Sequence, residues 1–183
     1  MISLILKKKY LFFLCIIVLN VLICNSVSAQ RISNCGAEMF ADKIISLGIK
    51  RGDELSYYSK LIKYNANEYW MYYAPKGRDS SCRIILKVDD DGYVDKIMVF
   101  GTAVSYSGRE NVVVSANVCL GVLGLSPDEI IYLSEEMDTY NPGNGDICLA
   151  KSVWSNTIYK TIRIYYVMKA DRSFAAFIDE KKD

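Results

Sequence analysis

Histidine is absent from all 183 residues, and this limits the chemistry that the chain can perform. The usual general base near neutral pH and the commonest metal ligand are therefore missing. Ser-His-Asp and Cys-His catalysis are excluded, as are zinc sites built on histidine. A Ser-Lys nucleophile is also not indicated, because no serine is followed by lysine three residues later. We expect a protein that is not an enzyme and that holds no metal or cofactor.

Carboxylates are concentrated in two places. The segment Asp89–Gly92 invites a calcium site, but an EF-hand loop needs glutamate at its twelfth position, which is Phe100 here. An Asp-Gly step between alternating apolar segments favours a hairpin turn instead. Glu129, Glu135 and Glu136 could supply the acid pair of a sugar hydrolase, which needs carboxyls about 5–10 Å apart. Neighbouring residues on a helix point in different directions, so a solvated helix face is favoured.

Four cysteines follow the N-terminal segment: Cys35, Cys82, Cys119 and Cys148. Their spacing matches no CxxC metal or redox motif. An even number of cysteines in an exported chain predicts two disulfides, for which three pairings are possible, and free or metal-bound thiols are the alternative. We prefer Cys35 with Cys82 and Cys119 with Cys148, because closures between neighbouring elements are the simplest. Each bridge should contribute roughly 3–4 kcal/mol by restricting the unfolded chain.

Aromatic side chains exceed the background in one short segment. Seven tyrosine and tryptophan residues fall between Tyr57 and Tyr73, among them Tyr69, Trp70 and Tyr72. Tyrosine rings commonly fill the edge of a small core with their hydroxyls in water. Rings on both faces of one strand also indicate anchors for a protein partner, where such residues concentrate binding energy. Stacking on sugars is a third option. We predict Tyr69, Trp70, Tyr72 and Tyr73 as binding residues. A second aromatic group comprises Trp154, Tyr159, Tyr165 and Tyr166.

The first 29 residues have the parts of a secretory signal peptide. Lys7-Lys8-Lys9 precede an apolar segment, Tyr10 to Cys24, and small residues lead up to Ala29. The apolar segment is shorter than the ~20 residues of a membrane-spanning helix. We expect cleavage after Ala29, which leaves Gln30–Asp183 as a periplasmic or extracellular chain. An uncleaved anchor is one alternative. A lipoprotein signal is another, but bulky Ile23 stands where that pattern needs a small residue.

The charge of the predicted mature chain is nearly balanced. Three of the 22 basic residues lie in the predicted signal peptide, so 19 remain against 21 acidic ones. Nucleic-acid binding needs a concentrated basic surface, and so does attraction to an anionic membrane. We therefore expect neither nucleic acid nor stable membrane insertion of the mature chain.

The first elements follow from periodicity and capping signals. Asn34 can cap a helix from Cys35 to about Leu47, with Gly48 ending it. The segment Asp53–Tyr64 is ambiguous, and a strand is favoured. Further strands are predicted for three segments, of which the last two form a hairpin through the Asp-Gly step: Glu68–Tyr73, Cys82–Val88 and Val94–Phe100.

The later elements are a helix pair and more strands. Capping-box spacings at Ser107 and Glu110, and at Ser126 and Glu129, start two helices. The first helix is expected to bury Val113, Ala116, Leu120 and Leu123, and a break follows at Gly121–Gly124. The second helix runs toward Met137 and stops before the loop at 141–145. Strands are predicted for Ile147–Trp154, Thr157–Met168 and Ser173–Ile178.

This order of elements predicts an α+β fold. We expect antiparallel sheet with a short N-terminal helix and a central helix pair on one face, in a single domain at 30–183 or in two small related halves. The layout is similar to that of the β-lactamase inhibitory protein and of BamE-like folds, an architectural resemblance that covers no motif and carries no residue across. We predict a non-catalytic exported binding protein: an inhibitor, an immunity protein or an envelope accessory module. The alternative is a ligand-binding protein, or an acid-residue hydrolase, with a pocket between helices and sheet.

Overall fold

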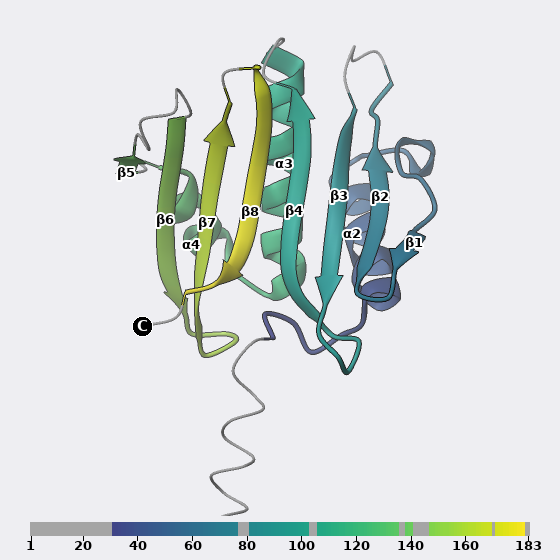
Figure 1. Cartoon of the computed structure of the whole chain (residues 1–183), viewed down its shortest axis with the longest axis horizontal. Coiled ribbons are helices and arrows are strands. Elements are labelled where there is room, and N and C mark those ends of the chain that lie inside the picture. Colours follow the sequence, from purple (N-terminus) through teal and green to yellow (C-terminus); the bar gives the residue numbers. More distant parts are fainter. Residues whose placement is uncertain are drawn as a thin grey trace, which may run out of the picture. The chain divides into compact units, whose positions relative to one another are not determined.

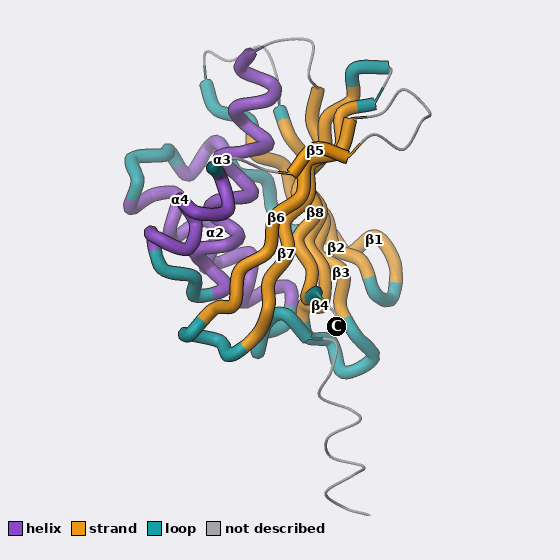
Figure 2. The backbone as a smooth tube through the Cα atoms, turned by 90° about the vertical axis from the view of Figure 1, so that its left-hand side faces the viewer, coloured by secondary structure: helices purple, strands orange, loops and turns teal. Residues whose placement is uncertain are grey.

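The computed structural model describes residues 31–76, 81–102, 106–135, 138–140, 147–169 and 171–181. The predicted signal peptide and the loop at 141–145 lie outside the described residues. The Arg31–Asp183 unit contains one antiparallel sheet with the described α-helices on one of its faces (Figures 1 and 2). The predicted α+β class is confirmed. Within the described part of the chain, no helix combines the length and apolar character needed to cross a membrane.

The described elements, in chain order, are as follows. They are α2 (Ala37–Lys50), a 3-10 turn (Leu55–Tyr57), β1 (Ile62–Asn65), β2 (Glu68–Tyr73), β3 (Cys82–Val88), β4 (Val94–Thr102), α3 (Tyr106–Leu123), α4 (Pro127–Ser134), β5 (Asp138–Tyr140), β6 (Ile147–Ser155), β7 (Lys160–Met168) and β8 (Ser173–Glu180).

The sheet joins two antiparallel meanders at its centre. Its strand order is β1-β2-β3-β4-β8-β7-β6-β5, so each meander runs from one edge toward the middle. The seam is the pairing of β4 with β8, which places Ile97 opposite Ile178 and Val99 opposite Ala176. These four residues are buried beneath the helices. The core is therefore continuous across the two meanders.

Helix α2 begins and ends differently from the prediction. Gly36 is the N-cap and no side chain caps the helix, so the predicted cap at Asn34 is wrong. Gly48 lies inside the helix, where a Cβ would come within 1.9 Å of the Tyr58 hydroxyl. Gly52 takes the left-handed conformation past the last turn, with φ of 102°. The glycine that ends the helix is thus Gly52, and Gly48 makes room for a neighbouring ring.

Several strands are confirmed with small changes of boundary. β2 has the predicted bounds, and β3 and β4 form the predicted hairpin, with Gly92 at φ of 84°. Only the end of the segment Asp53–Tyr64 is a strand, because a 3-10 turn comes first. Three predicted C-terminal strands are present as β6, β7 and β8, whereas the short strand β5 was not predicted.

The two central helices are confirmed. In α3, Ala116, Leu120 and Leu123 are buried and Val113 is partly buried. Gly124, with φ of 99°, ends this helix. The predicted capping box opens α4, which stops at Ser134 and not near Met137. The side chain of Ser107 lies outside the described side chains.

The capping box of α4 makes a prediction for stability. The Glu129 carboxylate accepts from the N–H groups of Ser126 and Asn156, and the Ser126 hydroxyl accepts from the Glu129 N–H. Ser126→Ala should therefore lower the free energy of unfolding by about 1 kcal/mol, which urea denaturation followed by circular dichroism would measure. The exposed Pro127→Ala, one position along, serves as the matched control and should cost less. Equal losses in the two variants would contradict the capping role.

The same group predicts a dependence on pH. The hydrogen bond from the Ser126 N–H is the main reason that the pKa of Glu129 lies below its ordinary value of 4.5. A carboxyl whose pKa is lowered on folding stabilises the protein above its unfolded pKa, and this contribution disappears as the pH falls. Glu129→Gln should therefore destabilise at pH 7, and the difference should shrink as the pH falls from 4.5 through the lowered pKa of Glu129. A constant difference across this range would count against the carboxylate.

The predicted disulfides are absent from the structure. All four cysteines are free thiols, three of them buried and Cys148 partly exposed. Cys35 lies beside Val94, at the opposite end of the β3–β4 hairpin from Cys82. The length of β3, from Cys82 to Val88, separates them by about 20 Å, far beyond the ~7 Å between Cα atoms that a bridge allows. Cys119 belongs to α3, whereas Cys148 faces the other side of the sheet. Proximity in sequence was a poor guide to proximity in space.

The thiols can be counted directly. Cys82 donates to the Asn111 carbonyl oxygen and contacts the Ser115 hydroxyl, and burial raises the pKa of its thiol to about 11. Burial also raises the pKa of Cys119. Because the thiolate is the reactive form, Ellman's reagent should react slowly with the native Gln30–Asp183 chain, and fastest at Cys148. Unfolding in guanidinium without reductant should release four thiols, and a yield of none would restore the two disulfides.

Candidate functional site: the open face of the sheet

The sheet face opposite the helices is called the open face here. In Figure 1 the helices lie behind the sheet, so the open face is turned toward the viewer. Figure 2, seen along the sheet, shows helices on one side of the strands only. Side chains alternate between the two faces of a strand. In β2, Trp70 and Tyr72 therefore lie on the open face, whereas Tyr69 and Tyr73 point toward the helices, and Tyr73 is 5% exposed. The structure brings two of the four predicted binding residues together and separates the other two from them.

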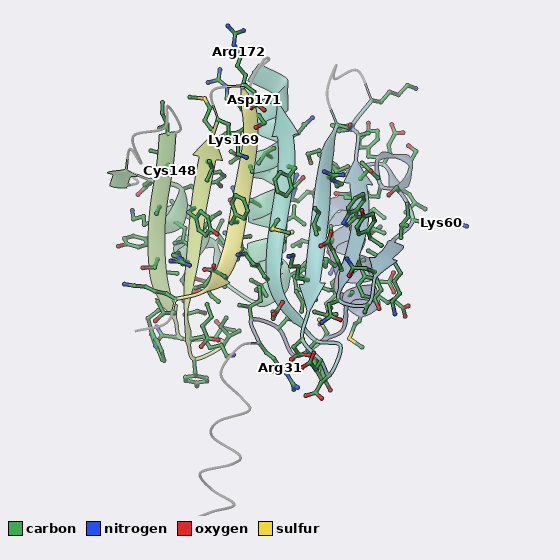
Figure 3. The ribbon with its side chains drawn as sticks, in the orientation of Figure 1. Arg31, Lys60, Cys148, Lys169, Asp171 and Arg172 are labelled. Carbon is green, nitrogen blue, oxygen red and sulfur yellow. The ribbon has the colours of Figure 1, made fainter. Side chains whose placement is uncertain are left out.

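Two neighbouring rows of apolar side chains cross the open face. Strand register aligns one row from Ile62 through Trp70, Ile85, Met98, Phe177 and Tyr165 to Ala150. The next row runs from Tyr72 through Arg83, Phe100, Ala175 and Val167 to Cys148. We call these two rows the apolar band; Figure 3 shows the side chains on this face and labels Cys148 on β6. Seven strands about 4.8 Å apart and two rows about 7 Å apart give it roughly 400 Å².

The rings of the band contact one another across the strands. Tyr64 stacks on Trp70 with ring centroids 3.9 Å apart, and the Arg83 guanidinium lies 4.3 Å from the Trp70 centroid. Beyond Arg83, Phe100 meets Phe177 edge-on at 5.7 Å, and Phe177 stacks on Tyr165 at 4.8 Å. Such contacts fix ring orientation in advance. The series crosses the β4–β8 seam and includes both meanders.

A row of charged side chains borders the band. Lys87 lies 3.9 Å from Glu68, and Lys96 lies 4.0 Å from Asp179. Arg163 donates two hydrogen bonds of 2.9 Å to Asp179, and these bonds are the main reason that its pKa is raised. An apolar centre with a polar rim is the usual anatomy of a protein–protein interface.

The acidic hairpin turn has a structural role that occupies its carboxylates. Asp89 accepts hydrogen bonds from the N–H groups of Asp91 and Tyr93, as an aspartate in a turn commonly does. Arg31 pairs with Asp89 and Asp91 and lies over the Tyr93 ring, so the first described residues are tied to the turn (Figure 3). Burial opposes the ionisation of Asp89, but these hydrogen bonds and Arg31 hold its pKa below the usual value. Among the described residues, no group of three metal-ligating side chains comes together.

Two pockets lie on the helix side. One, of about 360 Å³, is formed at the start of α2, the end of α3 and the β6–β7 turn, and includes Lys43 and Lys160. The other, of about 420 Å³, lies among the three helices and is mainly apolar, with Arg51 and Asn117 on its wall. Neither is lined by a carboxylate. Glu129 is occupied by its capping contacts. An acid pair for hydrolysis is therefore not assembled in these pockets.

No protein-family model, curated protein or solved structure matches the chain. Sequence analysis did not find most members of the band, namely Ile85, Met98, Phe100, Phe177 and Val167. The sequence does contain a signal for these residues, because apolar side chains recur at every second position of β3, β4, β7 and β8. This alternation defines a continuous surface only when the order of the strands is known.

Proposed function

We propose that the Arg31–Asp183 unit is a non-catalytic binding protein that docks on a protein partner through the open face. The apolar band carries this proposal: two aligned rows of rings and aliphatic side chains lie on a sheet face that no described helix covers. The largest apolar patch on an ordinary monomer covers about 300–600 Å² and is often functional. A standard interface buries about 800 Å² on each partner. The band alone covers about half of that area, and the charged row beside it adds to the surface available for docking.

Export is part of the proposal. It is supported by the basic, apolar and small-residue pattern of residues 1–29 and by a compact unit that begins at Arg31, soon after the expected cleavage site. Buried thiols suit an oxidising compartment, since burial keeps Cys82 and Cys119 protonated and slow to react. An inhibitor, an immunity protein or an envelope accessory protein fits this description.

The experiment compares variants of the mature chain as bait in extracts of the native envelope and medium. Trp70→Ala removes the ring that contacts both Tyr64 and Arg83, and Tyr165→Ala removes one in the other meander. We expect each to weaken retention of a specific protein by about 30-fold, as for an interface hot spot of 2 kcal/mol. Tyr159→Ala, in the β6–β7 turn and 76% exposed, is the matched control and should retain it.

The proposal requires one partner that follows this pattern. Thermal unfolding must first show that all variants remain folded. We expect them to fold, because Trp70 and Tyr165 are both partly exposed. A protein retained equally by wild type and by both band variants would contradict docking through the open face. Retention of no specific protein by wild type would contradict the protein-partner function.

One observation favours a second candidate, a small-ligand-binding protein. The amide oxygen of Asn117 is buried, and no residue in the described part of the chain forms a hydrogen bond with it; Asn117 also lines the apolar pocket of about 420 Å³. An apolar ligand with a hydroxyl or N–H donor would satisfy this oxygen. 1-Octanol should raise the melting temperature of wild type more than that of Asn117→Leu; equal shifts would remove the support for this function.

A further inference from the structure

Arg83 differs from the other cations of the open face. Lys87, Lys96 and Arg163 each have a carboxylate within 4.0 Å. Among the described residues, Arg83 has none, although it belongs to the apolar band between Tyr72 and Phe100. Its positive charge is therefore surrounded by rings and aliphatic side chains.

The guanidinium of Arg83 is held in place by those rings. It lies 4.3 Å from the Trp70 ring centroid and 5.9 Å from that of Phe100. Tyr64 stacks on Trp70 with ring centroids 3.9 Å apart, so this ring cannot easily turn away. The Nε atom of Arg83 is buried and has no hydrogen-bond partner among the described residues. A planar cation fixed in this way has already lost much of the rotamer freedom that binding would otherwise remove.

From these contacts we infer that the partner places an aspartate or glutamate carboxylate on Arg83, from a protein segment with apolar side chains on both sides of the acid. This inference rests on the proposed docking through the open face. Carboxylates accept paired hydrogen bonds from the guanidinium fork. The neighbouring residues of the band, Trp70, Tyr72 and Phe100, provide the apolar contacts around it.

The surroundings of Arg83 favour a single acidic side chain over a polyanion. Nucleic acid engages several cations at once, whereas the other cations of this face are already paired with Glu68 and Asp179. A cationic partner would meet Arg83 with like charge. One carboxylate would neutralise Arg83, which has no carboxylate within 4.0 Å among the described residues.

The test uses two blocked tripeptides of the same shape, acetyl-Leu-Asp-Tyr-amide and acetyl-Leu-Asn-Tyr-amide, at millimolar concentration. Each is titrated into ¹⁵N-labelled mature chain, and the signals of the Trp70 indole N–H and the Arg83 Nε–H are followed. We expect the Asp peptide to bind about tenfold more tightly than the Asn peptide, because a charge-assisted hydrogen bond is roughly twice as strong as a neutral one. Arg83→Gln should remove this difference.

Arg163→Gln is the matched control, because Arg163 also lies over a ring on the open face but already has Asp179 as its partner. It should leave the tenfold preference intact. Equal affinity of wild type for the two peptides would overturn the carboxylate inference, and so would an undiminished preference for the Asp peptide in Arg83→Gln. In either case, binding of the peptides at the band would still support the docking face. If neither peptide shifts the Trp70 signal, the docking face fails, and the inference fails with it.

Discussion

Replacing Phe40 with alanine is expected to lower the free energy of unfolding by about 3–5 kcal/mol, the largest loss we predict for a single residue. Phe40 is completely buried on α2 and belongs to the hydrophobic core under the first meander. The cost combines the lost burial of a phenyl ring with the cavity that rigid neighbours leave behind. Because domains of this size are stabilised by about 5–15 kcal/mol in all, much of the native stability would be lost.

The measurement is urea denaturation of the mature chain, followed by far-ultraviolet circular dichroism. Met39→Ala is the matched control, since Met39 precedes Phe40 on the same helix and is 58% exposed. It should change the free energy of unfolding by no more than about 0.5 kcal/mol, as exposed substitutions usually do. Similar losses in the two variants would mean that the core does not include the buried face of α2.

Gly101→Val is expected to destabilise the protein by about 3 kcal/mol, at the upper end of the range for overpacking a core. Gly101 lies on β4 opposite Phe174 of β8 and faces Val112 of α3. A Cβ at this position would lie 2.5 Å from Cγ2 of Val112, which is completely buried. The strand or the helix must therefore move to accommodate any side chain.

A second substitution separates this clash from other effects of valine. Val112→Ala alone should destabilise by opening a cavity, but in the Gly101→Val background it should be neutral or stabilising. The coupling between the two positions, measured by a double-mutant cycle in urea, should be at least about 1 kcal/mol. Strictly additive losses would show that Gly101 is not required for the contact between β4 and α3.

Elements with strong local signals were predicted well. The hairpin around Gly92 and the capping box of Ser126 and Glu129 each depend on residues close in sequence, and both are present. The start and end of α2 were not predicted: Gly36 forms an isolated bridge with Tyr93, and the end at Gly52 rather than Gly48 depends on the position of the Tyr58 ring. That position is a tertiary contact, which local patterns do not contain.

The candidate site was predicted only in part for the same reason. The aromatic segment pointed to β2, but residues adjacent on a strand face opposite sides, so Trp70 and Tyr73 could not belong to one surface. Arg83 and Phe100 join that surface through the β2–β3 and β3–β4 pairings, and Tyr165 joins it only when β4 pairs with β8. The disulfide prediction failed because it used sequence separation as a substitute for this strand order.

The central seam also sets the order in which the sheet can form. It pairs Ile97 with Ile178 and Thr102 with Ser173, positions separated by more than seventy residues. Long-range pairings of this kind slow folding, because a large loop must close before its contacts stabilise anything. Until β8 arrives, β4 is an edge strand with unpaired backbone groups and with Ile97 and Val99 on its apolar face. The first meander is therefore most vulnerable to aggregation during synthesis, and a factor that shields the β4 edge at that stage would raise the yield of native protein.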